Sequence, residues 1–570
     1  MAEPYIIAID FGTTYSGYAY SLTSRQADVD PHVHLWGSEV SLRTSKAPTC
    51  ILFNDHEEFV SFGYKAQKAY LKMRGEEARS FFFFENFKMS LYGTKPNRDL
   101  NIKAVNGKSM NALKVFTEAL RFIKDDALKT IAENTEGKKF IASDFTWVLT
   151  VPAIWDHSAK HFMREAASSA GFTNTGEEFK FVIALEPEAA SVWCRKLPAD
   201  GFISDNHGKV CLDESLGTQY IVVDCGGGTI DITVHEVLHG GALKELHKAS
   251  GHDMGGETVN REFKRFLNEI FGDVVWGKYI KNYPGELQEI LYDFTILKEN
   301  DEAVDISCPY NLSEQVREEG GRDMADYFGT VRSASWKDGC IELSREKMRS
   351  FFDASLKGIT KSLREILSKD FRIEYIVLVG GYSQSKILRQ HIRSQFDGQC
   401  RVLCPLGPQE AVMKGAVMFG RNPAAVASRK SAFTYGVDVD VPFDASKHEA
   451  KRKIQTDVGE KCCIFWKLVD VEADVKWNET KDLRFSPAQF KQKSMSFTFY
   501  RTERKDPLYV DEWGVEKLGS FAVSMPDTTR DLNRNVILKI TFGFTEIKAT
   551  ATDEDSGSTE SIELDFMTTT

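Results

Sequence analysis

The stretch Asp224-Cys-Gly-Gly-Gly-Thr-Ile-Asp231 decides the fold of this chain. It lies between two apolar runs, Tyr220-Ile-Val-Val223 and Ile230-Asp-Ile-Thr-Val234, a pattern that predicts a strand, a tight turn and a second strand. Three consecutive glycines have no Cβ atoms, so the turn can adopt positive φ and bring its N–H groups close to a ligand. The two aspartates would repel a bare anion but suit a magnesium–phosphate complex. Taken alone, the stretch could equally be an ordinary glycine-rich hairpin.

A second stretch of the same kind lies near the amino terminus. The apolar run Ile6-Ile-Ala-Ile-Asp10 ends in an aspartate, Gly12 and Thr13 follow, and Tyr18 to Leu22 is again β-like. Two such hairpins far apart in the sequence indicate a duplicated core. Each half would contribute one phosphate-binding turn, and a nucleotide would lie in the cleft between them.

Length and composition narrow the class of protein. The 570 residues are too many for one hydrophobic core, and 42% hydrophobic with 27% charged residues is typical of soluble globular domains. The net charge of −11 argues against a nucleic-acid-binding surface and against adhesion to acidic membranes. No secretory signal and no apolar run of about 20 residues is present. The ten cysteines are dispersed without a CxxC pair, which favours reduced thiols and a location in the cytoplasm or nucleus.

The first part of the chain alternates between strand and helix patterns. An apolar stripe predicts a long helix over 112–134, and buried strands are expected at 145–151 and 181–185. Helices are expected over 260–300 and 345–368, while the charged stretch 311–335 is expected to be rich in loops.

The character of the sequence changes near residue 422. From Phe433 onward, short alternating segments are separated by Gly, Asp, Pro and Lys, which predicts an antiparallel β-sandwich. The expected domains are therefore an α/β region at 1–422, a linker at 423–432 and a β-sandwich at 433–566.

Several common sites are excluded or weakly supported. The glycines of 251–256 have P-loop spacing, but Glu257 occupies the lysine position and would repel phosphates. His157 and His161 have zinc-ligand spacing, yet no third ligand lies nearby, so packed or solvated histidines are the better interpretation. The pair Gly380-Gly381 follows a buried strand at 375–379 and could lie flat against a ribose or base, although a plain strand-to-helix turn is the alternative.

These motifs together resemble the actin/hexokinase/heat-shock ATPase superfamily, and within it the seventy-kilodalton heat-shock proteins. The resemblance implies a duplicated ribonuclease-H-like, actin-like two-lobed ATPase domain followed by the β-sandwich. The matching stretches, in chain order, are Asp10-Phe-Gly-Thr-Thr-Tyr15, Thr150-Val-Pro-Ala153, Glu186-Pro-Glu-Ala-Ala190, Asp224 to Asp231, Gly255-Gly-Glu257, Ile376-Val-Leu-Val-Gly-Gly-Tyr-Ser383 and Glu410-Ala-Val-Met-Lys-Gly415; Ile547 to Asp553 matches the sandwich more weakly.

The sequence also departs from the family pattern. Gln384 stands where the family carries an arginine that stacks on adenine, and Ala424 to Lys430 replaces the leucine-rich linker. The chain ends soon after the β region with Met567-Thr-Thr-Thr570, so neither a helical lid nor an acidic docking tetrapeptide is expected. These departures resemble the divergent, lidless twelve-type branch of the family.

The resemblance implies binding of ATP or ADP with Mg²⁺ between the lobes. Asp10 and Asp224 would hold the metal, largely through water. Glu186 and Asp231 would orient metal-bound or attacking water, and Thr229 would act with them at the magnesium and γ-phosphate. Lys88, matched through Phe84-Glu-Asn-Phe-Lys88, would neutralise charge on the γ-phosphate. The remaining nucleotide contacts implied by the resemblance are Gly12, Thr13, Thr14, Tyr15, Gly226, Gly227, Gly228, Gly255, Gly256, Glu257, Lys298, Gly380, Gly381, Tyr382 and Gln384.

Three functions are compatible with these patterns. The first is a weak ATPase and chaperone-like protein, of the stress-response type, that binds protein clients or partners through its β-sandwich. The second is a nucleotide-binding scaffold or adaptor with little turnover, which the altered linker and absent lid favour. The third is a small-molecule kinase of the same superfamily. No polar sugar-binding cluster accompanies the phosphate motifs, and the appended β region is a second argument against this function.

Overall fold

The computed structural model describes residues 5–22, 30–73, 75–173, 180–203, 211–542 and 547–563. The chain forms two compact units, one of Met1–Val237 with Ala249–Pro423 and one of Leu238–Lys248 with Ala424–Thr570. Each unit is described by itself. The carboxyl-terminal residues 564–570, for which no acidic motif was expected, lie outside the described residues.

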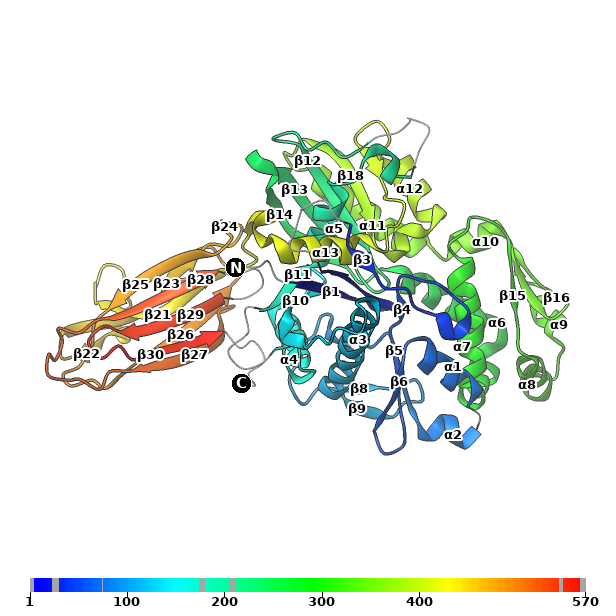
Figure 1. Ribbon diagram of the computed structural model, residues 1–570, viewed down its shortest axis with the longest axis horizontal. Coiled ribbons are helices and arrows are strands. Elements are labelled where there is room, and N and C mark those ends of the chain that lie inside the picture. Colours follow the sequence, from blue (N-terminus) through cyan, green and yellow to red (C-terminus); the bar gives the residue numbers. More distant parts are fainter. Residues whose placement is uncertain are drawn as a thin grey trace. The chain divides into compact units, whose positions relative to one another are not determined.

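The first lobe of the larger unit is built on a buried mixed sheet (Figure 1). Strand β1 (Tyr5–Phe11) forms an antiparallel hairpin with β2 (Tyr15–Ser21) and runs parallel to β10 (Phe145–Val151), which is parallel to β11 (Phe181–Leu185). Every residue of β10 is buried, as expected for a strand covered on both faces. The short strands β3 (His32–Val33) and β4 (Ala47–Pro48) pair with β2.

The second lobe repeats this pairing. Strand β12 (Gln219–Cys225) forms an antiparallel hairpin with β13 (Ile230–Val237) and runs parallel to β18 (Ile373–Val379). The order of the strands in this lobe is β19 (Arg401–Leu403), β18, β12 and β13. Strand β14 (Leu243–His252) follows β13 along the chain and begins in the smaller unit. The duplicated core predicted from the two Asp–Gly–Thr hairpins is therefore confirmed.

Helices cover both faces of the first sheet. Helix α3 (Ala112–Asn134) has the predicted bounds, is capped by the Asn111 side chain and packs with α4 (His157–Ser169). On the opposite face α13 (Ala411–Arg421) lies against α5 (Glu186–Cys194), as Figure 1 shows. Helices α11 (Asp353–Leu367) and α12 (Lys386–Phe396) pack together in the second lobe.

Smaller elements complete each lobe. In the first lobe these are β5 (Cys50–Phe53), β6 (Phe59–Phe62), α1 (Tyr64–Lys72), α2 (Gly75–Ser80), β7 (Phe82–Glu85), β8 (Asn101–Lys103) and β9 (Ser109–Asn111). In the second lobe they are α6 (Gly256–Asn282), α7 (Pro284–Leu297), β15 (Val304–Ser307), β16 (Ala334–Lys337), β17 (Cys340–Leu343) and α10 (Arg345–Ser350).

The expectation of a loop-rich stretch over 311–335 is wrong. Helices α8 (Tyr310–Gly320) and α9 (Met324–Phe328) occupy most of it. The buried residues Leu312, Val316 and Phe328 supply an apolar stripe, but it is too sparse among the charges to stand out in the sequence.

The smaller unit is an antiparallel β-sandwich, as predicted. One sheet has the order β22 (Ile454–Thr456), β23 (Gly459–Val469), β21 (Thr434–Pro442), β26 (Ser494–Thr502) and β27 (Glu516–Ser524). The other has the order β25 (Glu479–Phe485), β28 (Val536–Phe542), β29 (Ile547–Asp553) and β30 (Thr559–Glu563). Alternate residues such as Val437, Phe497, Leu538 and Ala549 form the shared core.

The stretch 423–432, predicted as a linker, contains a short strand. Strand β20 (Val426–Lys430) pairs with Leu243 and Lys244 of β14 and with β24 (Asp474–Lys476). The ammonium groups of Lys244 and Lys430 both lie 2.7 Å from the Asp474 carboxylate. These contacts fix the strand within the smaller unit.

Candidate functional site

The two glycine-containing turns, at residues 10–15 and 224–231, pack directly on one another. A Cβ atom on Gly227 would lie 2.1 Å from the Thr14 hydroxyl, and one on Gly228 would lie 2.5 Å from the Thr13 hydroxyl. None of Gly226, Gly227 and Gly228 has the positive φ that the sequence suggested. The glycines are therefore required for close approach between the turns and not for a left-handed backbone.

The start of α6 holds the second turn in place. The N–H groups of Gly255, Gly256 and Glu257 donate to the carbonyl oxygens of Gly228, Gly226 and Gly227 at 3.1, 3.0 and 2.8 Å. These three bonds satisfy the carbonyl oxygens of the glycine run. Gly255 and Glu257 thus hold the glycine turn in place through their backbone N–H groups.

Gly380 fits a position that other residues could not occupy. Its φ is 84°, and a Cβ atom there would lie 2.3 Å from Asp224 Oδ1 and 2.4 Å from the Cys225 carbonyl oxygen. The Gly380 N–H donates to Pro408 O at 2.9 Å. The end of β18 is thereby pressed against the end of β12, beside the Asp224 carboxylate.

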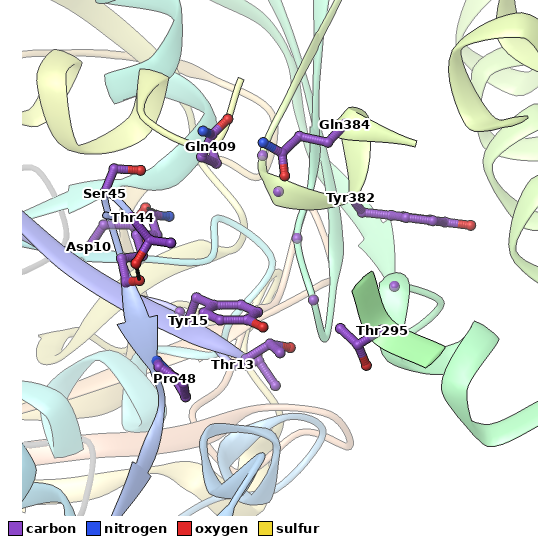
Figure 2. A pocket seen from close by; sticks show the side chains of 18 of the residues that line it. Asp10, Thr13, Tyr15, Thr44, Ser45, Pro48, Thr295, Tyr382, Gln384 and Gln409 are labelled. Atoms are coloured by element: carbon purple, nitrogen blue, oxygen red, sulfur yellow. Dashed lines mark hydrogen bonds and ion pairs between the residues drawn. The ribbon is translucent and has the colours of Figure 1, made fainter. Parts of the chain in front are cut away.

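The three glycine stretches surround one cavity of about 670 Å³. Figure 2 shows Asp10, Thr13 and Tyr15 of the first lobe on one side of it and Tyr382 and Gln384 of the second lobe on the other. The predicted site residues that line the cavity are Asp10, Gly12, Thr13, Thr14, Tyr15, Lys88, Glu186, Asp224, Gly226, Gly227, Gly228, Thr229, Gly256, Lys298, Gly380, Gly381, Tyr382 and Gln384.

Three predicted residues do not line it. Asp231 is 1% exposed and accepts the Ile154 N–H at 2.9 Å on Oδ1. Gly255 lies behind the glycine turn, and Glu257 faces a smaller neighbouring cavity, where it accepts a hydrogen bond from Asn260.

Lys88 and Glu186 form a buried ion pair at the floor of the cavity. The Lys88 ammonium donates to Glu186 Oε1 at 2.7 Å, and the ammonium lies 5.1 Å from the centre of the Trp155 ring. Lys88 lies in the short helical turn Phe87–Leu91, next to the buried strand β7, and Glu186 begins α5. The backbone of two separate elements therefore fixes both charges.

The carboxylates of the cavity repel one another. Burial raises the pKa of Glu186 to about 7; the Lys88 ammonium opposes the rise, and the Asp10 and Asp231 charges add to it. Burial, together with the Glu186, Asp231 and Asp10 charges, raises the pKa of Asp224 well above its usual range. A bound cation would relieve this repulsion.

The donor set fits magnesium. Asp10 and Asp224 are 4% and 5% exposed and line the same cavity. Among the described residues no group of three or more His, Cys, Asp or Glu side chains could hold a metal ion by itself. Mg²⁺ commonly uses one or two carboxylates and completes its shell with water and substrate phosphates, so two aspartates beside a phosphate turn suffice.

Several other residues that line the cavity are uncharged or have their charge engaged within the protein. The Lys298 ammonium donates to Gly256 O at 2.8 Å and to Asn260 Oδ1 at 2.6 Å, so its charge is used within the protein. Burial lowers the pKa of Lys298 to about 8. The Gln409 side-chain oxygen is buried with no hydrogen-bond partner among the described residues, and it lies near the cavity together with Gln384 (Figure 2).

Sequence reasoning missed several lining residues, and no motif marked them. They lie on the irregular stretch before β4, on α7 and ahead of α13, where neither periodicity nor spacing distinguishes them from surface residues. These residues are Leu35, Val40, Leu42, Thr44, Ser45, Lys46, Ile296 and Gln409.

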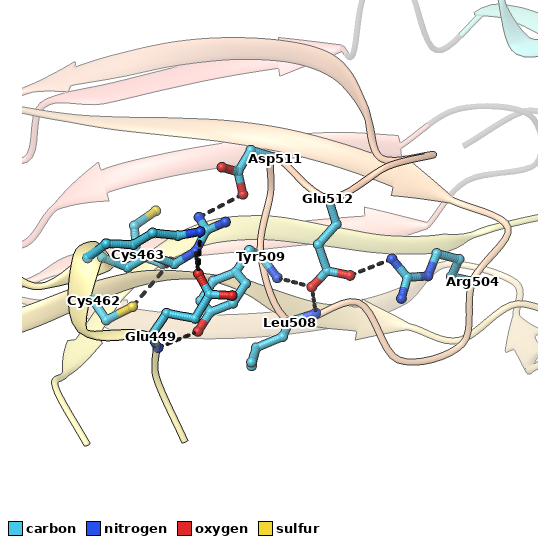
Figure 3. A network of polar contacts seen from close by, with 10 residues as sticks. Glu449, Cys462, Cys463, Arg504, Leu508, Tyr509, Asp511 and Glu512 are labelled. Atoms are coloured by element: carbon cyan, nitrogen blue, oxygen red, sulfur yellow. Dashed lines mark hydrogen bonds and ion pairs between the residues drawn. The ribbon is translucent and has the colours of Figure 1, made fainter. Parts of the chain in front are cut away.

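In the smaller unit, a polar network joins two loops of the β-sandwich (Figure 3). The Arg452 guanidinium pairs with Glu449 at 3.2 Å and Asp511 at 2.7 Å and lies over the Tyr509 ring at 3.9 Å. Glu512 accepts the Tyr509 N–H at 2.9 Å. Beyond this network, the Trp513 side chain is 90% exposed.

Comparison with known proteins gives a family and several relatives. The model of the Hsp70 protein family matches residues 84–426. The chain is 31% identical over 618 residues to heat shock 70 kDa protein 12A of Homo sapiens, which covers 99% of this chain and 91% of that protein. It is 32% identical over 630 residues to heat shock 70 kDa protein 12B of Homo sapiens, and this match also covers 99% of this chain and 91% of that protein.

A more distant bacterial relative matches part of the chain. The chain is 22% identical over 426 residues to the chaperone protein HscA homolog of Acinetobacter baumannii (strain AYE), covering 72% of this chain and 56% of that protein. Within the described part of the chain, no helix is long and apolar enough to cross a membrane. With the actin-like two-lobed fold and the family match over most of that fold, the chain belongs to the seventy-kilodalton heat-shock protein (Hsp70) family.

Proposed function

We propose that this protein binds ATP with magnesium between the two lobes, hydrolyses it slowly, and couples the nucleotide state to binding of protein clients or partners by its β-sandwich. One observation carries the proposal. Three glycine stretches from distant parts of the sequence converge on one cavity that also holds the buried Lys88–Glu186 pair.

The residues of the cavity divide into binding and reacting groups. Thr13 and Thr229 line the cavity and are each 6% exposed, so their hydroxyls would donate to phosphate oxygens with water largely excluded. Asp10 and Asp224 would hold magnesium, which when bound supplies positive charge to the β- and γ-phosphates.

Glu186 and Lys88 are placed for hydrolysis. In the reaction, water adds to the γ-phosphorus and the bond to the bridging oxygen breaks, giving ADP and phosphate. Glu186, with a pKa raised to about 7 by burial, is a stronger base than an ordinary carboxylate and would orient the attacking water. The Lys88 ammonium would neutralise charge developing on the γ-phosphate, and Asp231 would position the backbone at Ile154.

The exposed Trp513 and the Arg452 network support a role for the β-sandwich in binding protein partners. The Trp513 side chain is 90% exposed, so its apolar surface is left available to a protein partner.

The competing function is a nucleotide-binding scaffold with little turnover. The observation that favours it is the altered base end, where Gln384 replaces the stacking arginine and Lys298 is used by Gly256 and Asn260. Nucleotide could then bind without driving efficient turnover.

One experiment separates these functions. ATP hydrolysis is measured for the wild type and for Lys88→Ala, with and without an unfolded client peptide. Turnover that the peptide stimulates and the variant loses supports the ATPase, whereas tight binding without turnover supports the scaffold. Phosphorylation of a sugar or polyol would contradict both.

A further inference from the structure

Lys46 places a further, partly buried ammonium group beside Asp10 in the cavity. Its Nζ atom lies 2.5 Å from Asp10 Oδ2, and its side chain is 13% exposed. Lys46 lines the same cavity as the glycine turns. Neither the sequence motifs nor the roles proposed above use this residue.

The backbone around Lys46 is tied to the first phosphate turn. The Thr44 hydroxyl donates to Lys46 O at 2.8 Å. Three residues later, the Thr49 N–H donates to Thr14 O at 2.8 Å and its hydroxyl donates to Gly12 O at 2.9 Å. Lys46 is therefore held by a segment that is fixed to the turn itself.

The Lys46 side chain also packs closely on the hairpin. A Cβ atom on Gly17 would lie 2.9 Å from Lys46 Cγ, so the stem of the lysine occupies the space beside β2. Strand β4, which begins directly after Lys46, pairs Ala47 with Ser16 and Pro48 with Tyr15. The ammonium group is thus pre-positioned next to Asp10 and is not a flexible surface charge.

The Lys46 ammonium group balances negative charge among the buried carboxylates of the cavity. Asp10, Glu186 and Asp224 are buried and line the cavity, and the buried Asp231 adds a fourth carboxylate whose charge acts on Glu186 and Asp224. Lys88 is engaged with Glu186, which leaves Lys46 as the partner of Asp10. Lys46 is also the charge that opposes the raised pKa of Asp224.

We propose that Lys46 is a built-in cation of the nucleotide site, which takes over part of the charge neutralisation at Asp10 that a divalent ion would otherwise supply. A nucleoside di- or triphosphate would then bind with only weak dependence on magnesium. The inference rests on the proposed nucleotide binding and adds a residue to that site. A purely structural lysine, which only ties the segment to the hairpin, is the competing interpretation.

The test is equilibrium binding, without any measurement of turnover. Dissociation constants of fluorescent N-methylanthraniloyl-ADP are measured in excess Mg²⁺ and in EDTA for the wild type, Lys46→Met and Lys46→Arg. The readout is the ratio of the constant in EDTA to the constant in Mg²⁺. We expect this ratio to be at least about thirtyfold larger in Lys46→Met than in the wild type, because removing one partner of a buried charge pair typically weakens binding by such a factor.

Controls separate charge from structure. Lys46→Arg keeps the charge and should keep the wild-type ratio. Lys129→Met removes an exposed lysine of α3, with 75% of its side chain exposed, and should leave the ratio unchanged. If Lys46→Met does not fold, Lys46→Gln replaces it, since glutamine retains a donor for Asp10 and removes only the charge.

The outcomes are distinct for the two proposals. A wild type that binds nucleotide in neither Mg²⁺ nor EDTA overturns the proposed nucleotide binding and this inference with it. A wild type that binds in Mg²⁺, but whose ratio matches that of Lys46→Met or Lys46→Gln, overturns only the role of Lys46.

Discussion

Replacing Lys88 by methionine should destabilise the α/β unit strongly at alkaline pH and less at acidic pH. The substitution leaves the Glu186 carboxylate buried, 7% exposed, without its 2.7 Å partner. Removing one partner of a buried ion pair lowers the free energy of unfolding by about 3–5 kcal/mol. A carboxyl that can take up a proton limits this cost, because one pKa unit corresponds to about 1.4 kcal/mol.

The pH dependence follows from the direction of the pKa shift. Burial raises the pKa of Glu186 in the folded state to about 7 even with Lys88 present, and losing the ammonium raises it further. The folded state therefore holds more protons than the unfolded state above the ordinary pKa of the glutamate, and stability falls as pH rises to the folded pKa. In Lys88→Met that decline should continue to higher pH than in the wild type.

The assay is urea unfolding at pH 6 and pH 8, followed by tryptophan fluorescence, since Trp155 lies beside Lys88. We expect a loss of about 3 kcal/mol at pH 8 and a smaller loss at pH 6. The double variant Lys88→Met/Glu186→Gln, which removes both charges, should recover most of the loss. Equal stability of Lys88→Met and wild type at pH 8, or a double variant as unstable as the single one, would refute the reasoning.

Three further predictions concern other parts of the molecule. Gly380→Ala should weaken nucleotide binding in calorimetry by about tenfold or more, because its Cβ would lie 2.3 Å from Asp224 Oδ1 at a positive φ. Gly277→Ala, in α6 and outside the cavity, also has open space at its Cβ and should leave binding unchanged. Burial lowers the pKa of Lys298 in the folded state to about 8. Between about pH 8 and 10 the unfolded chain therefore binds more protons at Lys298 than the folded chain, so this residue makes the free energy of unfolding rise with pH. Urea unfolding should show that this rise is missing in Lys298→Met, and the same pH profile in the variant and the wild type would contradict the prediction. Arg452→Ala should lower the free energy of unfolding by about 1 kcal/mol or less, since the ion pairs of Arg452 are partly exposed. The same change should speed limited proteolysis of the two loops that Arg452 joins. An unchanged rate of cleavage would show that the network does not hold these loops.

Much of the fold could be predicted because its signals are local. The two Asp–Gly–Thr hairpins and helix α3 each carry a periodic apolar pattern, and each appears with the expected bounds to within a few residues. Helices α8 and α9 were missed because their few buried side chains are diluted by charges, so tertiary packing and not periodicity fixes them.

From local pattern, the site was predictable where glycine or a carboxylate ends a strand, whereas Lys88 and Lys298 were predicted only through the family resemblance. Asp10, Asp224 and Gly380 lie at such positions and surround the cavity. Lys46 and Gln409 reach the cavity from irregular stretches, where the path of the chain is set by distant partners. The glycine run was identified for positive φ, whereas the structure requires it for contact with Thr13 and Thr14, a relation between segments that no local pattern contains.

The most direct test of ATP hydrolysis in this cavity is a single-turnover measurement. Excess protein is mixed with γ-labelled ATP and Mg²⁺, and phosphate release is followed for the wild type and for Glu186→Gln, with ATP affinity measured for both. We expect similar affinities and a release that is about a hundredfold faster in the wild type, the usual scale for a group that assists proton transfer. Equal release rates in the two proteins, or a wild type that does not bind ATP, would contradict the assignment of this cavity as an ATPase site.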